Sequence, residues 1–432
     1  MKRQRWRALY VSALVMLFTH QPVLAQQRED IGQLRQQMAE QRRLMEAMEK
    51  RLLELEGKEK ARPTTGLEAG YTKGDGALRR GITAKDIYDG GFYVKTDDDS
   101  FSLRVNGFGQ VRYTFFEPEK GKSNHNFDVA LARIAFSGHV FDPRVSYFMQ
   151  YEASTFGNSN RVSALDWWMK YSFTPDFALQ AGRFILPYSR QFYTHPGNLL
   201  FSDLSAADYA FNLQRAIGTH AGGKIGPVSF DGALTNSIRA LDAGGQQNFG
   251  DELAWLGRVE IDILDPYGYL ESSPTPVSAP QLSIGAAGAF NPIDEASTFQ
   301  NVMPGDRTTN ATLDGGFRWD RFSFQAAGHF RHNNFKTLDR KSGEDWGYYA
   351  QAGFYLVPER WELSGRVSGV DFARSNNPNV RGDIMEYTAG LNYYLYGHNV
   401  KLQMDYSFID TDTFSGGNRG DHLLRVQTQF LF

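Results

Sequence analysis

The chain has 432 residues, a formal charge of −3, no cysteine, 43 glycines, 32 phenylalanines and 21 tyrosines. The lack of cysteine excludes disulfide staples and thiolate metal sites. A near-neutral charge without a basic stripe argues against a nucleic-acid partner, whereas many aromatic residues and glycines suit the curved strands and aromatic girdles of membrane barrels.

The first 25 residues indicate a secretory signal peptide. A basic start is followed by an apolar stretch, 8–19, which is too short to span a membrane, and by small residues at 23–25 that suit cleavage. We therefore expect an exported protein whose mature chain begins near Gln26. No later run approaches the roughly 20 apolar residues of a spanning helix, so the exported protein is either soluble or a barrel.

Residues 26–62 are predicted to form a coiled coil. Their apolar residues recur at alternating spacings of three and four, the pattern of an a/d seam, and Gln41 fills the one polar slot. The heptads indicate an oligomer without fixing its number; the alternative is an amphipathic helix that lies on its own barrel. The seam comprises Ile31, Leu34, Met38, Met45, Met48, Leu52 and Leu55.

Residues 63–89 read as a linker, rich in glycine and charge and without a sustained period. From residue 90 to 432 apolar and polar side chains alternate, which predicts strands. After a tight turn at 97–99 we count sixteen long segments, an even number that encloses an aqueous channel. They are 101–116, 127–141, 143–156, 161–173, 176–184, 213–224, 226–236, 251–264, 280–291, 308–319, 321–334, 345–357, 359–373, 383–396, 399–411 and 421–432.

The last segment, 421–432, shows the pattern most clearly. Leu424, Val426, Phe430 and Phe432 share one face, and polar residues including Arg425 share the other. Such a strand can turn its apolar face to lipid and its polar face to a lumen; an edge strand of a soluble sandwich is the alternative.

The connections between segments alternate in length. Those after even-numbered segments are short, and most of those after odd-numbered segments are long, as expected for periplasmic turns and external loops of outer-membrane barrels. The exception is 265–279, a long Pro-rich connection where a short turn is expected, which leaves fourteen and eighteen strands open. We predict an all-β, sixteen-stranded antiparallel transmembrane barrel in the outer membrane, preceded by a helical coiled coil in the periplasm.

Several stretches resemble the phosphate-selective porin O and P family over about residues 90–432. They are GFYVKTDDDSFSLRVNGFGQVRY, RIAFSGHVF, WWMKYSFTPDFALQAGRFILPYSRQ, EYTAGLNYYLYGHNVKLQMDYSF and the closing RVQTQFLF. The resemblance implies a homotrimeric porin with sixteen strands, whose phosphate-selective members line the pore with arginines. Adjacent arginines in the second strand would fall at Ala132 and Arg133, and this chain keeps only Arg133.

The resemblance also implies that the loop after the fifth strand, 185–212, folds into the lumen; an ordinary external loop is the alternative. Arg112 and Arg133 share an inward face on adjacent strands, and we expect Arg190 of the loop to meet them in a site for small anions. Elsewhere the lumen charges are balanced, which is typical of structural ion pairs. The predicted pore-lining residues are Arg112, Arg133, Lys170, Tyr188, Arg190 and Tyr193.

We expect passive diffusion of small hydrophilic solutes with an anion (phosphate-like) preference, and no cofactor or metal. A general or sugar-selective porin is the nearest alternative, because Trp167, Trp168, Tyr188 and Tyr193 could form a sugar slide. An outer-membrane hydrolase is a further alternative, but the sequence contains no nucleophile elbow of the G-x-S-x-G type. A purely structural envelope tether is the remaining alternative.

Overall fold

The structure, a computed structural model, divides into two compact units, Met1–Gly66 and Leu67–Phe432. In the first unit residues 38–53 form a helix with exposed side chains, as the heptad pattern predicts, and the rest of the predicted coil and the signal peptide lie outside the described residues. No described helix is both long and apolar enough to cross a membrane. The described residues are 38–53, 66–74, 78, 81–83, 87–154, 161–236, 238, 252–292, 307–334, 342–372, 381–413 and 417–432.

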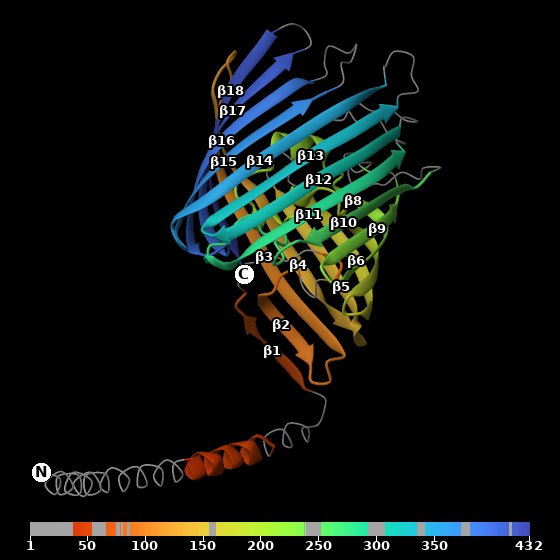
Figure 1. Cartoon of the computed structure of the whole chain (residues 1–432), viewed down its shortest axis with the longest axis vertical. Coiled ribbons are helices and arrows are strands. Elements are labelled where there is room, and N and C mark those ends of the chain that lie inside the picture. Colours follow the sequence, from red (N-terminus) through yellow and green to blue (C-terminus); the bar gives the residue numbers. More distant parts are fainter. Residues whose placement is uncertain are drawn as a thin grey trace, which may run out of the picture. The chain divides into compact units, whose positions relative to one another are not determined.

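Sixteen antiparallel strands close into a barrel (Figure 1). Each strand pairs with the next along the chain, and β18 pairs with β3, which confirms the predicted number. The strands are β3 (Phe101–Glu117), β4 (Asn124–Val140), β5 (Asp142–Ser154), β6 (Arg161–Thr174), β7 (Phe177–Ile185), β8 (Arg215–Ile225), β9 (Val228–Thr235), β10 (Ala254–Asp262), β11 (Val277–Pro292), β12 (Arg307–Asp320), β13 (Phe322–Asn334), β14 (Gly343–Val357), β15 (Trp361–Asp371), β16 (Arg381–Tyr396), β17 (Val400–Thr413) and β18 (Gly417–Leu431).

The alternation of side chains sets the two faces of the wall. In β18 Gln427 and Gln429 are buried on the lumen side, whereas Val426 and Phe430 are exposed on the outside. Because successive residues of a strand point to opposite faces, each strand contributes one apolar and one polar row. The apolar rows together form the band that faces lipid.

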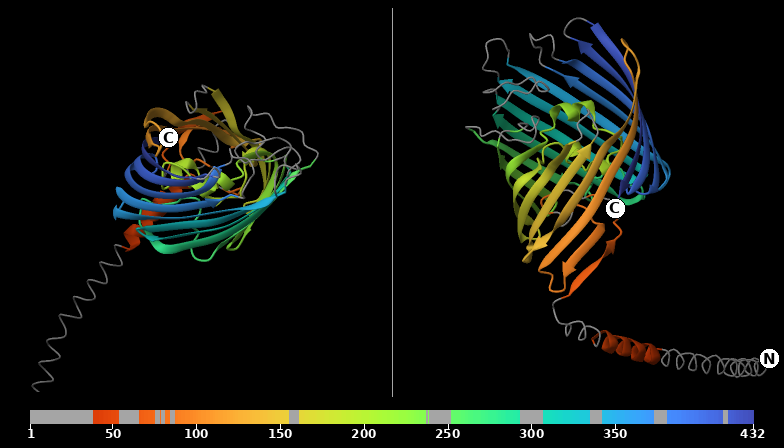
Figure 2. Two further views of the ribbon diagram at one scale, coloured as in Figure 1. Left: turned by 90° about the horizontal axis from the view of Figure 1, so that it is seen from above. Right: turned by 180° about the vertical axis from the view of Figure 1, so that it is seen from behind.

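A hairpin of β1 (Leu67–Thr72) and β2 (Gly91–Thr96) extends one end of the barrel (Figure 2). β2 pairs with residues 102–105 of β3, and β18 pairs with residues 108–117 of the same strand. The linker prediction for 63–89 is therefore wrong at β1. Six alternating residues next to glycine-rich sequence are too short a pattern to be recognised as a strand.

The barrel ends differ as the sequence indicates. Six of the seven connections at one end contain one to three residues, and the turns after β8 and β16 use Gly226 and Gly397 in the left-handed region, with φ of 57° and 54°. The seventh, between β10 and β11, is the long connection that left the strand count open. The count holds, and this connection folds into the lumen instead.

Close pairing of β3 and β4 depends on Gly138, because a Cβ at this position would lie 1.9 Å from the backbone oxygen of Ser102. We expect Gly138→Ala to push the two strands apart and to lower the free energy of unfolding by about 1–3 kcal/mol. The measurement is the urea midpoint of unfolding in detergent. Gly257→Ala in β10 is the matched control, because no atom lies within 4 Å of its Cβ position. Equal midpoints for the two variants would contradict the prediction.

Candidate functional site

The connection between β7 and β8, residues 186–214, lies inside the barrel, where Figure 2 shows its short helices. It contains α2 (Arg190–Tyr193), η2 (Pro196–Asn198) and α3 (Ala206–Phe211). Ser189 and Ser205 cap α2 and α3 by accepting hydrogen bonds from backbone N–H groups of the first turn. We name this connection the constriction loop.

The constriction loop is bonded to strands far from its own in the sequence. The backbone N–H of Ala207 donates to Ser368 Oγ of β15 at 2.9 Å, and that of Ser202 donates to Asp405 Oδ2 of β17 at 3.0 Å. Asn392 of β16 donates to the oxygen of Leu200 at 2.9 Å. These contacts hold the loop along the inner wall from β15 to β17.

Arg190 anchors the start of the loop. Its side chain is fully buried, with Nε 2.7 Å from Asp314 Oδ1 and Nη2 2.8 Å from Glu260 Oε2. Its guanidinium also lies 5.7 and 5.4 Å from the ring centroids of Tyr267 and Tyr269. Arg190 is therefore a structural residue with paired donors, and it is not available to a solute.

The prediction that Arg190 meets Arg112 and Arg133 is wrong. Arg190 binds carboxylates of β10 and β12, whereas Arg112 of β3 binds the far end of the loop. Two buried carboxylates attract the guanidinium of Arg190, whereas the two other arginines would repel it. Sequence spacing gives the length of the loop but not the wall that it follows.

Arg112 and Arg133 are also separated from each other. Arg133 stands opposite Phe108, four residues along β3 from Arg112, whereas Arg112 itself stands opposite Asp128 after a one-residue bulge between Gln110 and Val111. Four residues along a strand correspond to about 13 Å at roughly 3.3 Å per residue. Arg133 instead forms an ion pair with Glu152 at 2.6 Å.

Three arginines from separate strands surround the far end of the constriction loop. Arg112 donates to the oxygen of Ser202 at 2.6 Å and lies 3.3 Å from Asp203 Oδ2. Arg425 of β18 lies 3.6 Å from the same carboxylate, and Arg366 of β15 donates to the backbone oxygen of Asp203 at 2.9 Å. We call Arg112, Arg366 and Arg425 the arginine cluster.

Asp203 is the accessible member of this group, with 41% of its side chain exposed against 12% and 16% for Arg112 and Arg425. The surrounding protein disfavours the charged form of Asp203, but Arg425 and Arg112 outweigh this effect and hold the pKa of its carboxyl below the ordinary value. At neutral pH the loop therefore presents a carboxylate to the cluster.

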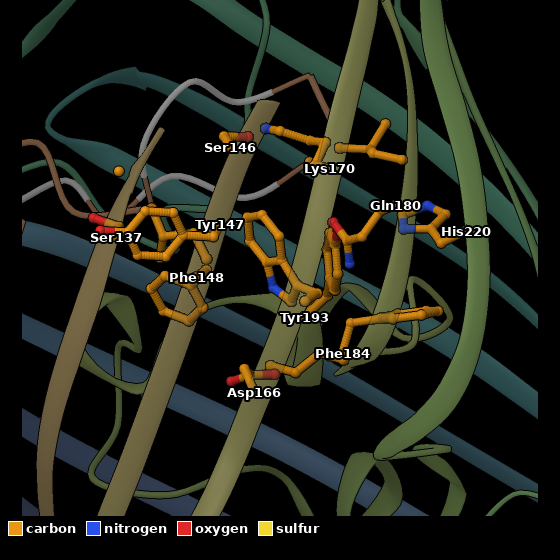
Figure 3. A pocket seen from close by; sticks show the side chains of 16 residues that line it. Ser137, Ser146, Tyr147, Phe148, Asp166, Lys170, Gln180, Phe184, Tyr193 and His220 are labelled. Carbon is orange, nitrogen blue, oxygen red and sulfur yellow. The ribbon is translucent and has the colours of Figure 1, made fainter. Parts of the chain in front are cut away.

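The other predicted site residues lie apart from the cluster. Tyr188 is buried in a hydrophobic cluster with Phe184 and Leu213. Tyr193 packs edge-on against Tyr269, with ring centroids 5.0 Å apart. Tyr193 also lines, with Lys170 of β6, a cavity against the wall from β4 to β8 (Figure 3).

Sequence reasoning missed the role of residues 263–276. This connection enters the lumen beside the constriction loop, and Glu271 accepts hydrogen bonds from the Leu200 N–H at 2.7 Å and from Gln191 at 3.0 Å. Burial raises the pKa of Glu271, and these hydrogen bonds act in the opposite direction. In the sequence, the unexpected length of this connection is the one sign that it enters the lumen.

Known proteins resemble this chain in sequence and in fold. The model of the family "Phosphate-selective porin O and P" matches residues 104–257. Residues 104–257 therefore resemble this family, and the chain has the fold of outer-membrane porins. The chain is 24% identical over 316 residues to an uncharacterized protein of Aquifex aeolicus (strain VF5), and the match covers 68% of this chain and 69% of that protein.

Two solved structures share the fold of this chain at low identity. An anion-selective porin from Comamonas acidovorans is 12% identical with a TM-score of 0.53, over 77% of this chain and all of that chain (100%). The trimer form of OmpT, an outer-membrane protein of Vibrio cholerae, is 8% identical with a TM-score of 0.51, over 77% and 100% of the two chains. The family whose model matches is one of porins, which favours a channel over the hydrolase alternative.

Removing the Arg190 anchor is expected to loosen the constriction loop. Arg190→Ala leaves Glu260 and Asp314 buried with Arg258 as the remaining cation that pairs with both, and breaking a buried pair costs about 3–5 kcal/mol. We expect a higher and noisier single-channel conductance. Arg144→Ala is the control, because the pair between Arg144 and Asp142 is exposed and contributes little. A conductance unchanged in both variants would show that Arg190 does not hold the loop.

Proposed function

We propose that this porin passes small hydrophilic solutes by passive diffusion with a weak preference for anions. The arginine cluster at the far end of the constriction loop carries the proposal. Guanidinium groups stay charged at all accessible pH values and bind oxyanions through paired N–H donors. One structural relative is an anion-selective porin, which agrees with this direction.

The preference is expected to be weak because carboxylates offset the cluster. Asp203, Asp405 and Glu386 lie against Arg112, Arg366 and Arg425, so the formal charges cancel. Weak binding also suits a channel, since a solute must leave as readily as it enters.

Within the cluster, Arg425 is the residue that we expect to meet the solute. Its guanidinium lies 3.6 Å from Asp203 and 3.7 Å from Asp405, which is longer than a hydrogen bond. The donors of Arg112, in contrast, are used on Gln427, Ser202 and Asp203.

We do not expect strict phosphate selectivity. The arginine of the second strand, Arg133, is neutralised by Glu152, and Ala132 occupies the neighbouring position. The sugar-selective alternative is weaker, because Trp167 is 46% exposed on the outer face and Tyr188 is buried in a hydrophobic cluster. These positions do not favour a continuous aromatic slide.

The test is the reversal potential in a salt gradient. Asp203→Asn removes the carboxylate from Arg112 and Arg425, so anion selectivity should increase, and most clearly at low salt, because the Debye length is about 8 Å at physiological ionic strength. Arg425→Ala should shift selectivity toward cations.

Glu152→Gln is the matched control, because it removes a lumen carboxylate from Arg133 instead of from the cluster. A larger shift in Glu152→Gln than in Asp203→Asn would assign selectivity to Arg133. No shift in either Asp203→Asn or Arg425→Ala would refute the arginine cluster.

We further propose that residues 26–62 form a parallel trimeric coiled coil in the periplasm. On the helix 38–53 the seam residues Met38, Met45, Met48 and Leu52 are 53–69% exposed in the single chain, an apolar stripe that helix pairing would bury. The trimer form of OmpT supports a trimeric barrel.

Acidic residues introduced into the seam of the proposed coiled coil should separate its three helices. Met45→Asp with Met48→Asp places like charges at the trimer axis, so cross-linking through the coil should fall while the barrel keeps its heat-modifiable migration. Ala39→Asp with Ala47→Asp adds the same charge outside the seam and should leave cross-linking unchanged. Equal cross-linking of both double variants would exclude the coil.

A further inference from the structure

The turn between β16 and β17, residues 397–399, places one histidine inside the lumen. It is one of the short connections of the barrel, at the end that we expect to face the periplasm. Gly397 lies in the left-handed region, and the side chain of the next residue, His398, reaches inward and is 2% exposed. An ionisable ring therefore lies at the periplasmic end of the lumen.

His398 contacts two connections that enter the lumen. Its Nδ1 lies 3.1 Å from the backbone oxygen of Gly197 in the constriction loop. Its Nε2 lies 3.1 Å from the backbone oxygen of Ser272, in the connection between β10 and β11. One wall residue thus joins the two connections to each other and to the wall, and we call His398 the latch.

A buried lysine stands next to the latch. Lys401 of β17 is fully buried, and its Nζ donates to the oxygen of Leu199 at 2.9 Å and lies 3.5 Å from His398 Nδ1. The side-chain amide of Gln429 in β18 donates to the oxygens of Gly197 and His398, at 3.1 and 2.6 Å. These side chains hold this part of the constriction loop against the turn.

The hydrogen-bond partners assign a neutral imidazole to the latch. A neutral ring has one N–H donor, whereas an imidazolium has two. With the proton on Nε2, the ring donates to the Ser272 oxygen, and its Nδ1 accepts from the Lys401 ammonium. The Gly197 oxygen accepts from Gln429. Each of these contacts then joins a donor to an acceptor without a charge on His398.

A second proton on the latch would meet a like charge. It would bind at Nδ1, 3.5 Å from the Lys401 ammonium, where both side chains are buried. Burial and the charge of Lys401 lower the pKa of His398 from the ordinary 6.5 to about 3, and the contacts with the Ser272 and Gly197 oxygens act in the opposite direction. The ring in place is therefore neutral at neutral and moderately acidic pH.

The other ionisable groups around the latch differ in their effects. The Tyr394 ring of β16 stands edge-on at 5.4 Å from the imidazole, and Arg318 of β12 adds a further positive charge. Glu362 of β15 and Glu271 attract the charge of Lys401. Because burial raises the pKa of Glu271, its protonation favours the inserted connections in acid and opposes the effect of the latch.

We propose that His398 is an acid-released latch at the periplasmic mouth of the channel. At neutral pH it joins the constriction loop and the connection between β10 and β11 to the wall and keeps the mouth narrow. In acid the ring binds a proton and moves away from Lys401, the two connections separate at Gly197 and Ser272, and the mouth widens. This regulation rests on the channel function proposed above.

The direction follows from the proton that the released ring binds and the latched ring does not. Above pH 6.5 the imidazole is neutral in both states, so pH does not change their balance. Between pH 6.5 and about 3 the proton binds the released ring, which favours release by up to about tenfold per pH unit. The mouth should therefore widen progressively as the pH falls below 6.5.

Single-channel recording in symmetric potassium chloride, at about pH 7.5 and about pH 5, tests the latch. The full-length wild-type protein should occupy a higher conductance level on the order of tenfold more often at the lower pH. His398→Gln keeps a donor for Ser272 but does not titrate, so this variant should stay at the low level at both pH values. Equal occupancy in the wild type at the two pH values would overturn the latch.

A second variant separates the latch from a general effect of acid. In Lys401→Gln the ammonium is absent, so the imidazolium of His398 can donate to Gly197 and Ser272 together, and acid should no longer widen the mouth. His332→Gln is the matched control, because this histidine is 47% exposed on β13 and its loss should leave the wild-type response intact. A Lys401→Gln channel that responds to acid as the control does would also overturn the latch.

Two further readouts separate the latch from the channel function. Heat-modifiable migration at both pH values reports whether the barrel of each variant is folded. Folded wild-type protein that conducts equally at both pH values refutes the latch alone, whereas folded protein that does not conduct refutes the channel as well. Since the electrolyte is the same on both sides, neither result depends on the sign of ion selectivity.

Discussion

A buried cluster of four charges holds the constriction loop in place, and the rest of the lumen is arranged around that loop. Arg190 and Arg258 face Glu260 and Asp314, two charges of each sign, and each side chain is less than one tenth exposed. Burying a charge costs several kcal/mol unless it is paired and hydrogen-bonded. The loop therefore has one low-energy route across the barrel, the one that delivers Arg190 to both carboxylates.

Described residues of two other connections contact this loop, and the contacts meet at one asparagine. The side-chain amide of Asn198 in the constriction loop donates to the backbone oxygens of Leu78 and Tyr269, at 2.8 and 3.0 Å. The backbone oxygen of Asn198 accepts from the Glu271 N–H at 3.2 Å. A sixteen-stranded wall leaves a lumen too wide for side chains alone to fill. Here inserted backbone fills it, and each buried backbone group then requires a partner.

The wall was predictable from the sequence because its period is local. The alternation in 421–432 places Gln427 in the lumen and Phe430 outside, and the same pattern gave the other strands. The contents of the lumen were not predictable in this way. Arg190 and Arg112 lie in the expected loop and strand, but their partners are set by distant residues such as Asp314 and Asp203. The register of the ladder, which pairs Arg133 with Phe108, also places Arg133 four residues along the strand from Arg112. The predicted linker at 63–89 and the long Pro-rich connection at 265–279 carry no sustained period, so the sequence predicts neither β1 nor the inward course of residues 263–276.

The seam of the barrel has a consequence for the order of assembly. β18 and β3 are joined by backbone hydrogen bonds between Phe432 and Gly107, each 3.1 Å long, across almost the whole chain. Contacts of such high sequence separation form late, whereas the hairpin of β1 and β2 and its pairing with β3 are local and form early. The hairpin therefore covers residues 102–105 of an edge that stays open until the carboxy-terminal strand arrives. Unpaired edges are sites of aggregation, so the hairpin shortens the exposed edge during insertion and marks the position at which Phe432 stops.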